Sequence, residues 1–99
     1  MVGDLVIDIE RRQALFLAKP LELTHKEFEI LLYLAQNLGR AIGREQLFEH
    51  IWGYEMEFNS NSLDVYVYRV RKKLEGVAET PDYIQTLRGF GYKMVSPGP

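Results

Sequence analysis

Residues 61–75 read NSLDVYVYRVRKKLE, and their apolar residues recur at helical spacing. Leu63, Val67, Val70 and Leu74 stand at i, i+4, i+7 and i+11, which places them on one narrow stripe of an α-helix. The pattern predicts a helix that buries this stripe against a core and exposes the opposite side.

The predicted helix carries polar, cationic and aromatic residues away from its apolar stripe. At about 100° per residue, the opposite face collects Asn61, Ser62, Val65, Arg69, Lys72 and Lys73, with Tyr66 and Tyr68 on its flanks. An exposed face of this composition fits the major groove of DNA, although a generic amphipathic surface helix would show the same face. Arg71 lies nearer the buried stripe, so we expect it to hold local structure near Asp64 or Tyr68.

Single residues on this face suit particular groups of a DNA duplex. Arg69 can donate two hydrogen bonds to a guanine edge, Asn61 can hydrogen-bond to an adenine or a phosphate, and Val65 can pack against a thymine methyl group. Lys72 and Lys73 suit phosphates, which set register and affinity without carrying sequence information. The hydroxyls of the two flanking tyrosines can donate to phosphate oxygens. The exposed face is therefore a candidate reading surface.

The sequence before this helix predicts a small sheet and a first helix. Residues 5–9, 14–17 and 21–23 are β-rich stretches separated by turns, which indicates an antiparallel sheet within residues 1–23. Thr24 is a candidate N-cap because Glu27, three residues later, completes a capping box. Apolar residues follow at helical spacing until Asn37-Leu38-Gly39 stops the helix.

A second helix is expected from Arg44 to Trp52, with Gly53 ending it. The third helix begins near Ser60 or Asn61, which places Asp64 in its first turn. Together the three helices predict a helical core over residues 24–76.

The end of the chain predicts a β-hairpin over residues 83–95, with a glycine-rich turn at 88–91. Arg88 opens this turn, and an arginine at a hairpin tip can enter the narrow minor groove, where the negative potential is strongest. A plain turn with a surface arginine is the alternative. Residues 96–99 are expected to form a disordered tail.

Charge is distributed unevenly along the 99 residues, a length that fits one compact domain. The chain carries 12 basic and 14 acidic residues, for a formal net charge of −2. Residues 1–59 hold six basic against ten acidic residues, whereas residues 60–99 hold six against four. A nucleic-acid partner needs only a local basic footprint, and the cluster at 69–73 supplies one.

Several other classes of protein fit the sequence poorly. It contains no cysteine, which excludes disulfides and thiolate metal sites. His25 and His50 are the only histidines, and neither has a recognisable set of nucleophilic or metal-binding partners. We therefore expect no catalytic activity, no metal site and no cofactor. No apolar run approaches the roughly 20 residues that span a bilayer, and no signal peptide opens the chain, so a soluble cytoplasmic protein without membrane contact is expected.

Four blocks of sequence carry a resemblance to a known family. They are Leu23-Thr24-x-x-Glu27-Phe28-x-x-Leu31, Arg44-Glu45-x-Leu47 with Ile51-Trp52-Gly53, Leu63-Asp64-Val65-x-Val67-x-x-Val70-Arg71-x-Lys73-Leu74, and Ile84-x-Thr86-x-Arg88-Gly89-x-Gly91-Tyr92. In this order they resemble the C-terminal effector domain of OmpR/PhoB-type response regulators, from Leu5 to about Val95. The resemblance implies an α+β winged helix-turn-helix with a four-stranded N-terminal sheet, a three-helix core and a C-terminal hairpin wing.

The resemblance also implies a function, transcription regulation by sequence-specific binding to double-stranded DNA. Positions matching the DNA contacts of the family are Arg44, Trp52, Asn61, Tyr66, Tyr68, Arg69, Arg71, Thr86, Arg88 and Tyr92. Residues 53–59, which include Tyr54, Glu55, Met56, Glu57 and Phe58, match the loop through which family members touch RNA polymerase. An upstream receiver domain absent from this chain, a cognate histidine kinase and tandem dimers on direct-repeat half-sites are implied as well.

Three positions depart from the family pattern. Asn61 stands where arginine is common, Tyr66 where histidine is common, and Tyr68 where a basic residue is frequent. These departures weaken the electrostatic contribution to binding, so modest affinity at physiological salt is expected. A winged-helix protein-interaction module with little or no DNA binding is the alternative function.

Overall fold

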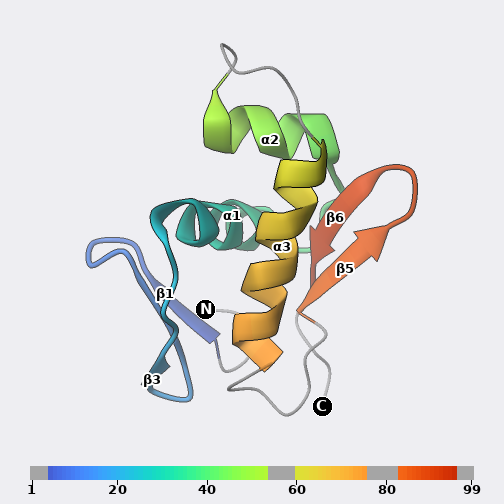
Figure 1. The fold of residues 1–99 in the computed structure, drawn as a ribbon. Coiled ribbons are helices and arrows are strands. Elements are labelled where there is room, and N and C mark those ends of the chain that lie inside the picture. The colour runs from blue at the N-terminus through green and yellow to red at the C-terminus, as the bar shows by residue number, and fades with distance from the viewer. Residues whose placement is uncertain (1–4, 54–59, 76–82, 96–99) are drawn as a thin grey trace.

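A computed structural model describes residues 5–53, 60–75 and 83–95 of the chain. Its elements are β1 (Leu5–Asp8), β2 (Gln13–Phe16), β3 (Lys19–Pro20), α1 (His25–Gln36), β4 (Ile42–Gly43), α2 (Arg44–Trp52), α3 (Ser60–Glu75), β5 (Ile84–Leu87) and β6 (Gly91–Met94). Three helices form the centre, with the N-terminal sheet on one side of α3 and the β5–β6 hairpin on the other (Figure 1). The observed α+β fold is the expected winged helix-turn-helix.

The N-terminal sheet is antiparallel, in the order β1-β2-β3, and its third strand lies earlier than expected. Leu5 and Phe16 are cross-strand partners and both face the core. Leu17 and Ala18 adopt left-handed backbone conformations, with φ of 50° and 67°, so the chain reverses directly after β2. The third strand therefore occupies residues 19–20, and the prediction of a strand at 21–23 was wrong. The described residues form three strands here, and residues 1–4 lie outside them.

Helix α1 begins as its sequence predicts. The Thr24 hydroxyl accepts a hydrogen bond from the Glu27 backbone N–H at 3.4 Å, and the Glu27 carboxylate accepts one from the Thr24 N–H at 2.9 Å. This capping box satisfies two backbone donors that a helix N-terminus otherwise leaves without partners. The helix ends at Asn37, and Gly39 follows with φ of 81°, so both predicted boundaries are confirmed.

Helices α2 and α3 also follow the sequence pattern closely. Helix α2 has the predicted bounds, and Gly53 ends it with φ of 92°. In α3 the four apolar residues of the predicted stripe, Leu63, Val67, Val70 and Leu74, are completely buried. The helix begins at Ser60, so Asp64 is its fifth residue and lies beyond the first turn. The prediction that Asp64 lies in the first turn was therefore wrong.

The C-terminal hairpin is confirmed, and it belongs to a larger sheet than the sequence suggested. Strand β4, directly before α2, pairs with β6, and the sheet order is β4-β6-β5. Gly91 of β6 faces Gly43 of β4, and a Cβ atom at Gly91 would overlap the carbonyl oxygen of Ile42. Only glycine allows this approach, which fixes the wing to the start of α2.

Among the described residues, no helix combines the length and apolarity needed to cross a membrane. Residues 76–82 and the tail at 96–99 lie outside the described part of the chain, so the expected disorder of the tail stays a prediction.

Candidate nucleic-acid interface

The exposed face of α3 holds much of the predicted reading surface. Val65 is 46% exposed and Tyr68 is 56% exposed, and Arg69 and Lys72 are exposed with them. Ser62 is half-buried, and the side chain of Asn61 lies outside the described residues. The apolar side chain of Val65, an arginine and a lysine thus share one accessible helix face, as direct base readout with phosphate anchoring requires.

One flank of this face is an aromatic cluster shared by α2 and α3. The Trp52 ring stacks on Phe48, with centroids 4.6 Å apart and planes 11° apart. Tyr66 lies against Trp52, with centroids 5.2 Å apart, and the Arg69 guanidinium carbon is 5.4 Å from the centre of the Tyr66 ring. Trp52 and Tyr66 are only partly buried, so both retain surface toward solvent.

Asp64 of α3 connects three elements on the other flank. Its carboxylate forms an ion pair with Arg44 at the start of α2, and it accepts a hydrogen bond from the Tyr92 hydroxyl of β6. Burial and the adjacent Asp64 carboxylate raise the pKa of Tyr92 to about 12. Tyr92 is only 5% exposed. The DNA contact predicted for Tyr92 stays a prediction, with its ring in the core and its hydroxyl bonded to Asp64.

Arg71 lies between α3 and the wing, where it holds local structure as expected, although its partners differ from those expected. Its guanidinium donates a hydrogen bond to the Thr86 hydroxyl of β5 at 2.8 Å, and its guanidinium carbon lies 5.9 Å from the centre of the Tyr92 ring. Arg71 and Thr86 thus link the helix to the hairpin, at the edge of the predicted reading surface.

Lys73 pairs with an acid of α1, and its predicted phosphate contact stays a prediction. Its ammonium nitrogen lies 2.5 Å from the Glu27 carboxylate of α1, which is nearly fully buried. Burial by itself would raise the pKa of Glu27, but hydrogen bonds from Lys73 and Thr24 outweigh burial and lower this pKa below its ordinary value of 4.5. A buried carboxylate needs such a partner, so Lys73 compensates the buried charge of Glu27.

Arg88 is exposed at the turn between β5 and β6. A small cavity of about 90 Å³ lies between this turn and helices α2 and α3, and Arg88, Thr86, Arg44 and Asp64 contribute to its wall. The wing arginine and Asp64 of α3 thus line the same cavity.

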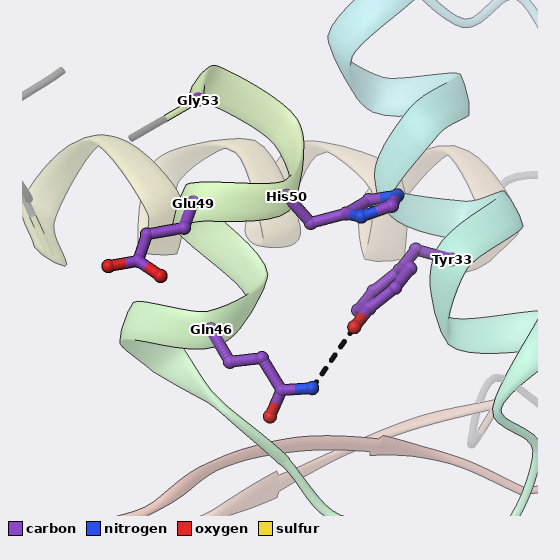
Figure 2. Close-up of a pocket in the computed structure, with 5 residues that line it drawn as sticks. All are labelled: Tyr33, Gln46, Glu49, His50 and Gly53. Carbon is purple, nitrogen blue, oxygen red and sulfur yellow. Dashed lines mark hydrogen bonds between the residues drawn. The ribbon is translucent and has the colours of Figure 1, made fainter. Parts of the chain in front are cut away.

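A larger pocket of about 410 Å³ lies between α1 and α2. Figure 2 shows His50 stacked on the Tyr33 ring, with centroids 3.8 Å apart, and the Gln46 amide donating to the Tyr33 hydroxyl at 3.0 Å. Glu49 and Gly53 complete the lining. In the described part of the chain, no group of three or more His, Asp or Glu side chains could hold a metal ion. The pocket histidine thus has a packing partner in Tyr33.

Sequence reasoning missed Glu27 and Asp64 as residues that position the interface. A signal existed for each, since Asp64 is an acid beside the buried stripe of α3 and Glu27 is an acid among the apolar residues of α1. Their partners lie 20 to 46 positions away, and no local pattern links such positions. The predicted polymerase-contact loop, Tyr54 to Phe58, lies outside the described residues.

Comparison with known proteins identifies the family of the chain. Residues 18–94 match the family described as transcriptional regulatory protein, C terminal. The chain is 40% identical over 97 residues to the alkaline phosphatase synthesis transcriptional regulatory protein PhoP of Bacillus subtilis, covering 98% of this chain and 40% of that protein. It is also 40% identical over 94 residues to the transcriptional regulatory protein VxrB of Vibrio cholerae, covering 95% of this chain and 36% of that protein. The chain thus spans about 40% of the length of these relatives.

Solved structures show the same fold over nearly the whole chain. The DNA-binding domain of CpxR from E. coli is 35% identical with a TM-score of 0.82, and the match covers 97% of this chain and 94% of that one. The DNA-binding domain of RstA from Klebsiella pneumoniae, solved in complex with the RstA box, is 31% identical with a TM-score of 0.83, covering 98% and 96%. This chain belongs to the C-terminal DNA-binding domains of OmpR/PhoB-type transcriptional regulators.

Proposed function

We propose that α3 of this domain enters the major groove of double-stranded DNA while Arg88 of the wing reaches the adjacent minor groove. The observation that carries the proposal is the shared exposure of Val65, Tyr68, Arg69 and Lys72 on the face of α3 that the wing flanks. An α-helix fits the width of the major groove, and a hairpin arginine is attracted by the negative potential of a narrow minor groove.

Within this arrangement we assign base discrimination to Arg69 and Val65. A guanidinium donates two hydrogen bonds to the O6 and N7 acceptors of guanine, and a valine side chain packs against the methyl group of thymine. Lys72 and Tyr68 lie on the same exposed face and contact phosphates. Ser62, Trp52 and Tyr66 complete the contact surface along one edge, and Arg44, Arg71 and Thr86 hold its other edge. Asn61 is a further proposed contact.

The wider role that we propose concerns the whole regulator. RNA polymerase binds residues 54–58, and an upstream receiver domain, phosphorylated by a histidine kinase, controls the pairing of two copies on direct-repeat half-sites. The length of the relatives, of which this chain spans about 40%, leaves room for such a receiver domain. The protein acts in the cytoplasm, where its DNA lies, and catalyses no reaction of its own.

Selection from a pool of randomised duplexes tests the DNA-binding proposal, with Arg69→Ala beside the wild-type domain. We expect the wild type to enrich one motif, and the variant to lose about 1–3 kcal/mol and its preference at one base position. Arg11→Ala is the matched control, because it removes the same charge from an exposed side chain on the β1–β2 turn. An unchanged motif and affinity in Arg69→Ala would show that another residue reads the bases.

A protein-interaction module remains the competing function, and one observation favours it. Arg44 and Lys73 pair with carboxylates of the domain itself, so they contribute less to a positive surface than the sequence suggested. Binding to duplex DNA at increasing salt separates the two functions, since only a DNA-binding domain releases phosphate counterions. Binding that does not change with salt, or no enrichment at low salt, would favour the interaction module.

A further inference from the structure

A continuous row of rings and one guanidinium runs from the core to the reading surface. The row starts at Phe48, which is buried, continues through Trp52 and Tyr66, and ends at the guanidinium of Arg69. The ring centroids of successive neighbours lie 4.6 Å and 5.2 Å apart, and the guanidinium carbon of Arg69 lies 5.4 Å from the last centroid. Arg69 therefore rests on a ring that is itself held by the core.

The Tyr66 ring is a fixed support for this guanidinium. Tyr66 is partly buried and packs against the core, whereas Tyr68, two residues later, is 56% exposed. Trp52 is held in turn by Phe48, and the Lys26 ammonium lies 5.5 Å from the Trp52 ring while donating to the Ile51 carbonyl at 2.9 Å. A guanidinium on a fixed ring keeps fewer rotamers than one in open solvent.

A second aromatic–cation pair on the same helix provides an internal comparison. The Lys72 ammonium lies 5.5 Å from the Tyr68 ring, so tyrosine and cation are again close neighbours on the helix surface. This ring is exposed and therefore not held by other rings of the core. Two pairs of similar chemistry thus differ in how firmly the ring is supported.

We propose that Tyr66 is a positioning residue that determines specificity by holding the Arg69 guanidinium in place before DNA binds. The inference rests on the proposed function, because it assigns to Arg69 the reading of a base. Forming two hydrogen bonds to a guanine edge requires one orientation of the guanidinium plane. A guanidinium already held near that orientation loses less side-chain entropy on binding, and this gain applies only to the base that the orientation fits.

The first experiment needs no DNA and compares arginine side chains in the free domain by nuclear magnetic resonance. We expect the side-chain protons of Arg69 to show an upfield ring-current shift and its Nε–Hε group to be more ordered than that of Arg11, whose side chain is 80% exposed. Tyr66→Phe retains the ring and should retain the shift, whereas Tyr66→Leu should lose it. Absence of the shift in the wild-type domain overturns the proposal without any variant.

The second experiment measures base preference with the same variants in the randomised duplex pool. We expect Tyr66→Leu to lower the affinity ratio between the best and second-best base at the Arg69 position by about threefold to fivefold, and Tyr66→Phe to restore it. Tyr68→Leu is the matched control and should weaken all sequences alike. If the leucine variant does not fold, Tyr66→Met takes its place.

The outcomes separate this proposal from the function on which it rests. A Tyr66-dependent shift with an unchanged base ratio in Tyr66→Leu overturns the positioning role while leaving DNA reading intact. A Tyr66-dependent shift in a wild-type domain that enriches no motif overturns the proposed function, and the specificity role with it. Loss of both the shift and the base ratio, with rescue by phenylalanine, supports both.

Discussion

The hydroxyl of Tyr92 donates a hydrogen bond to the carboxylate of Asp64, and this contact joins wing strand β6 to helix α3. Arg44 of α2 forms an ion pair with the same carboxylate, so three elements meet at one side chain. Arg71 and Thr86 form a second link between α3 and the wing. These polar contacts thus add to the pairing of β4 with β6 in orienting the wing relative to the helix face.

Tyr92 is expected to be the tyrosine that resists ionisation, because burial and Asp64 raise its pKa from 10 to about 12. A raised pKa means that the unfolded state releases its proton first. The stability that Tyr92 contributes is therefore complete below pH 10 and is lost as the pH rises toward 12. Titration of tyrosinate absorbance should show a last step near pH 12 in the wild-type domain that the Tyr92→Phe domain lacks. The prediction fails if Tyr92→Phe leaves that last step in place.

The ion pair between Glu27 and Lys73 predicts sensitivity to acid. The pKa of Glu27 lies below its ordinary value of 4.5, so its contribution is complete above pH 4.5 and is lost as the pH falls through the lower folded-state pKa. Glu27→Gln keeps an acceptor but removes the charge, and we expect it to lower the free energy of unfolding by about 1–2 kcal/mol at neutral pH. Urea unfolding should show this difference shrinking in acid. A difference independent of pH would assign the effect to packing.

Gly91→Ala should destabilise the domain by about 3 kcal/mol, because the added methyl group would overlap the Ile42 carbonyl and push β4 from β6. Gly43→Ala is the matched control, since a Cβ there meets only the Phe90 ring edge at 4.0 Å. The control should lower the free energy of unfolding by less than about 1 kcal/mol, because alanine is a poorer N-cap residue than glycine. Equal urea midpoints for the two variants would mean that the strands tolerate the methyl group.

Lys72 is expected to act on DNA affinity without acting on sequence preference. Lys72→Ala should weaken binding to every duplex and flatten the slope of log affinity against log salt by about one unit. Lys19→Ala removes the same charge from the exposed N-terminal sheet and should leave the slope unchanged. Fluorescence anisotropy over a salt series measures both. A loss confined to one sequence would instead place Lys72 among the base-reading residues.

Short-range patterns in the chain were sufficient to predict most of the fold and which face of α3 is exposed. The capping box of Thr24 and Glu27 depends on residues three positions apart, and the buried stripe from Leu63 to Leu74 depends on helical periodicity alone. The exposure of Val65 and Arg69 follows from the same periodicity. Interactions within a turn or two of helix are encoded locally, so the sequence reveals them without knowledge of the fold.

Tertiary structure alone decided which of the candidate cations and hydroxyls remain on the surface. Lys73 pairs with Glu27 across 46 positions, and Tyr92 bonds to Asp64 across 28, so each has a partner inside the domain that no local pattern indicated. Strand β4 is only two residues long and exists because β6 lies beside it. Burial of a charge or hydroxyl requires a partner, and that partner is chosen by packing in space, which periodicity along one helix cannot specify.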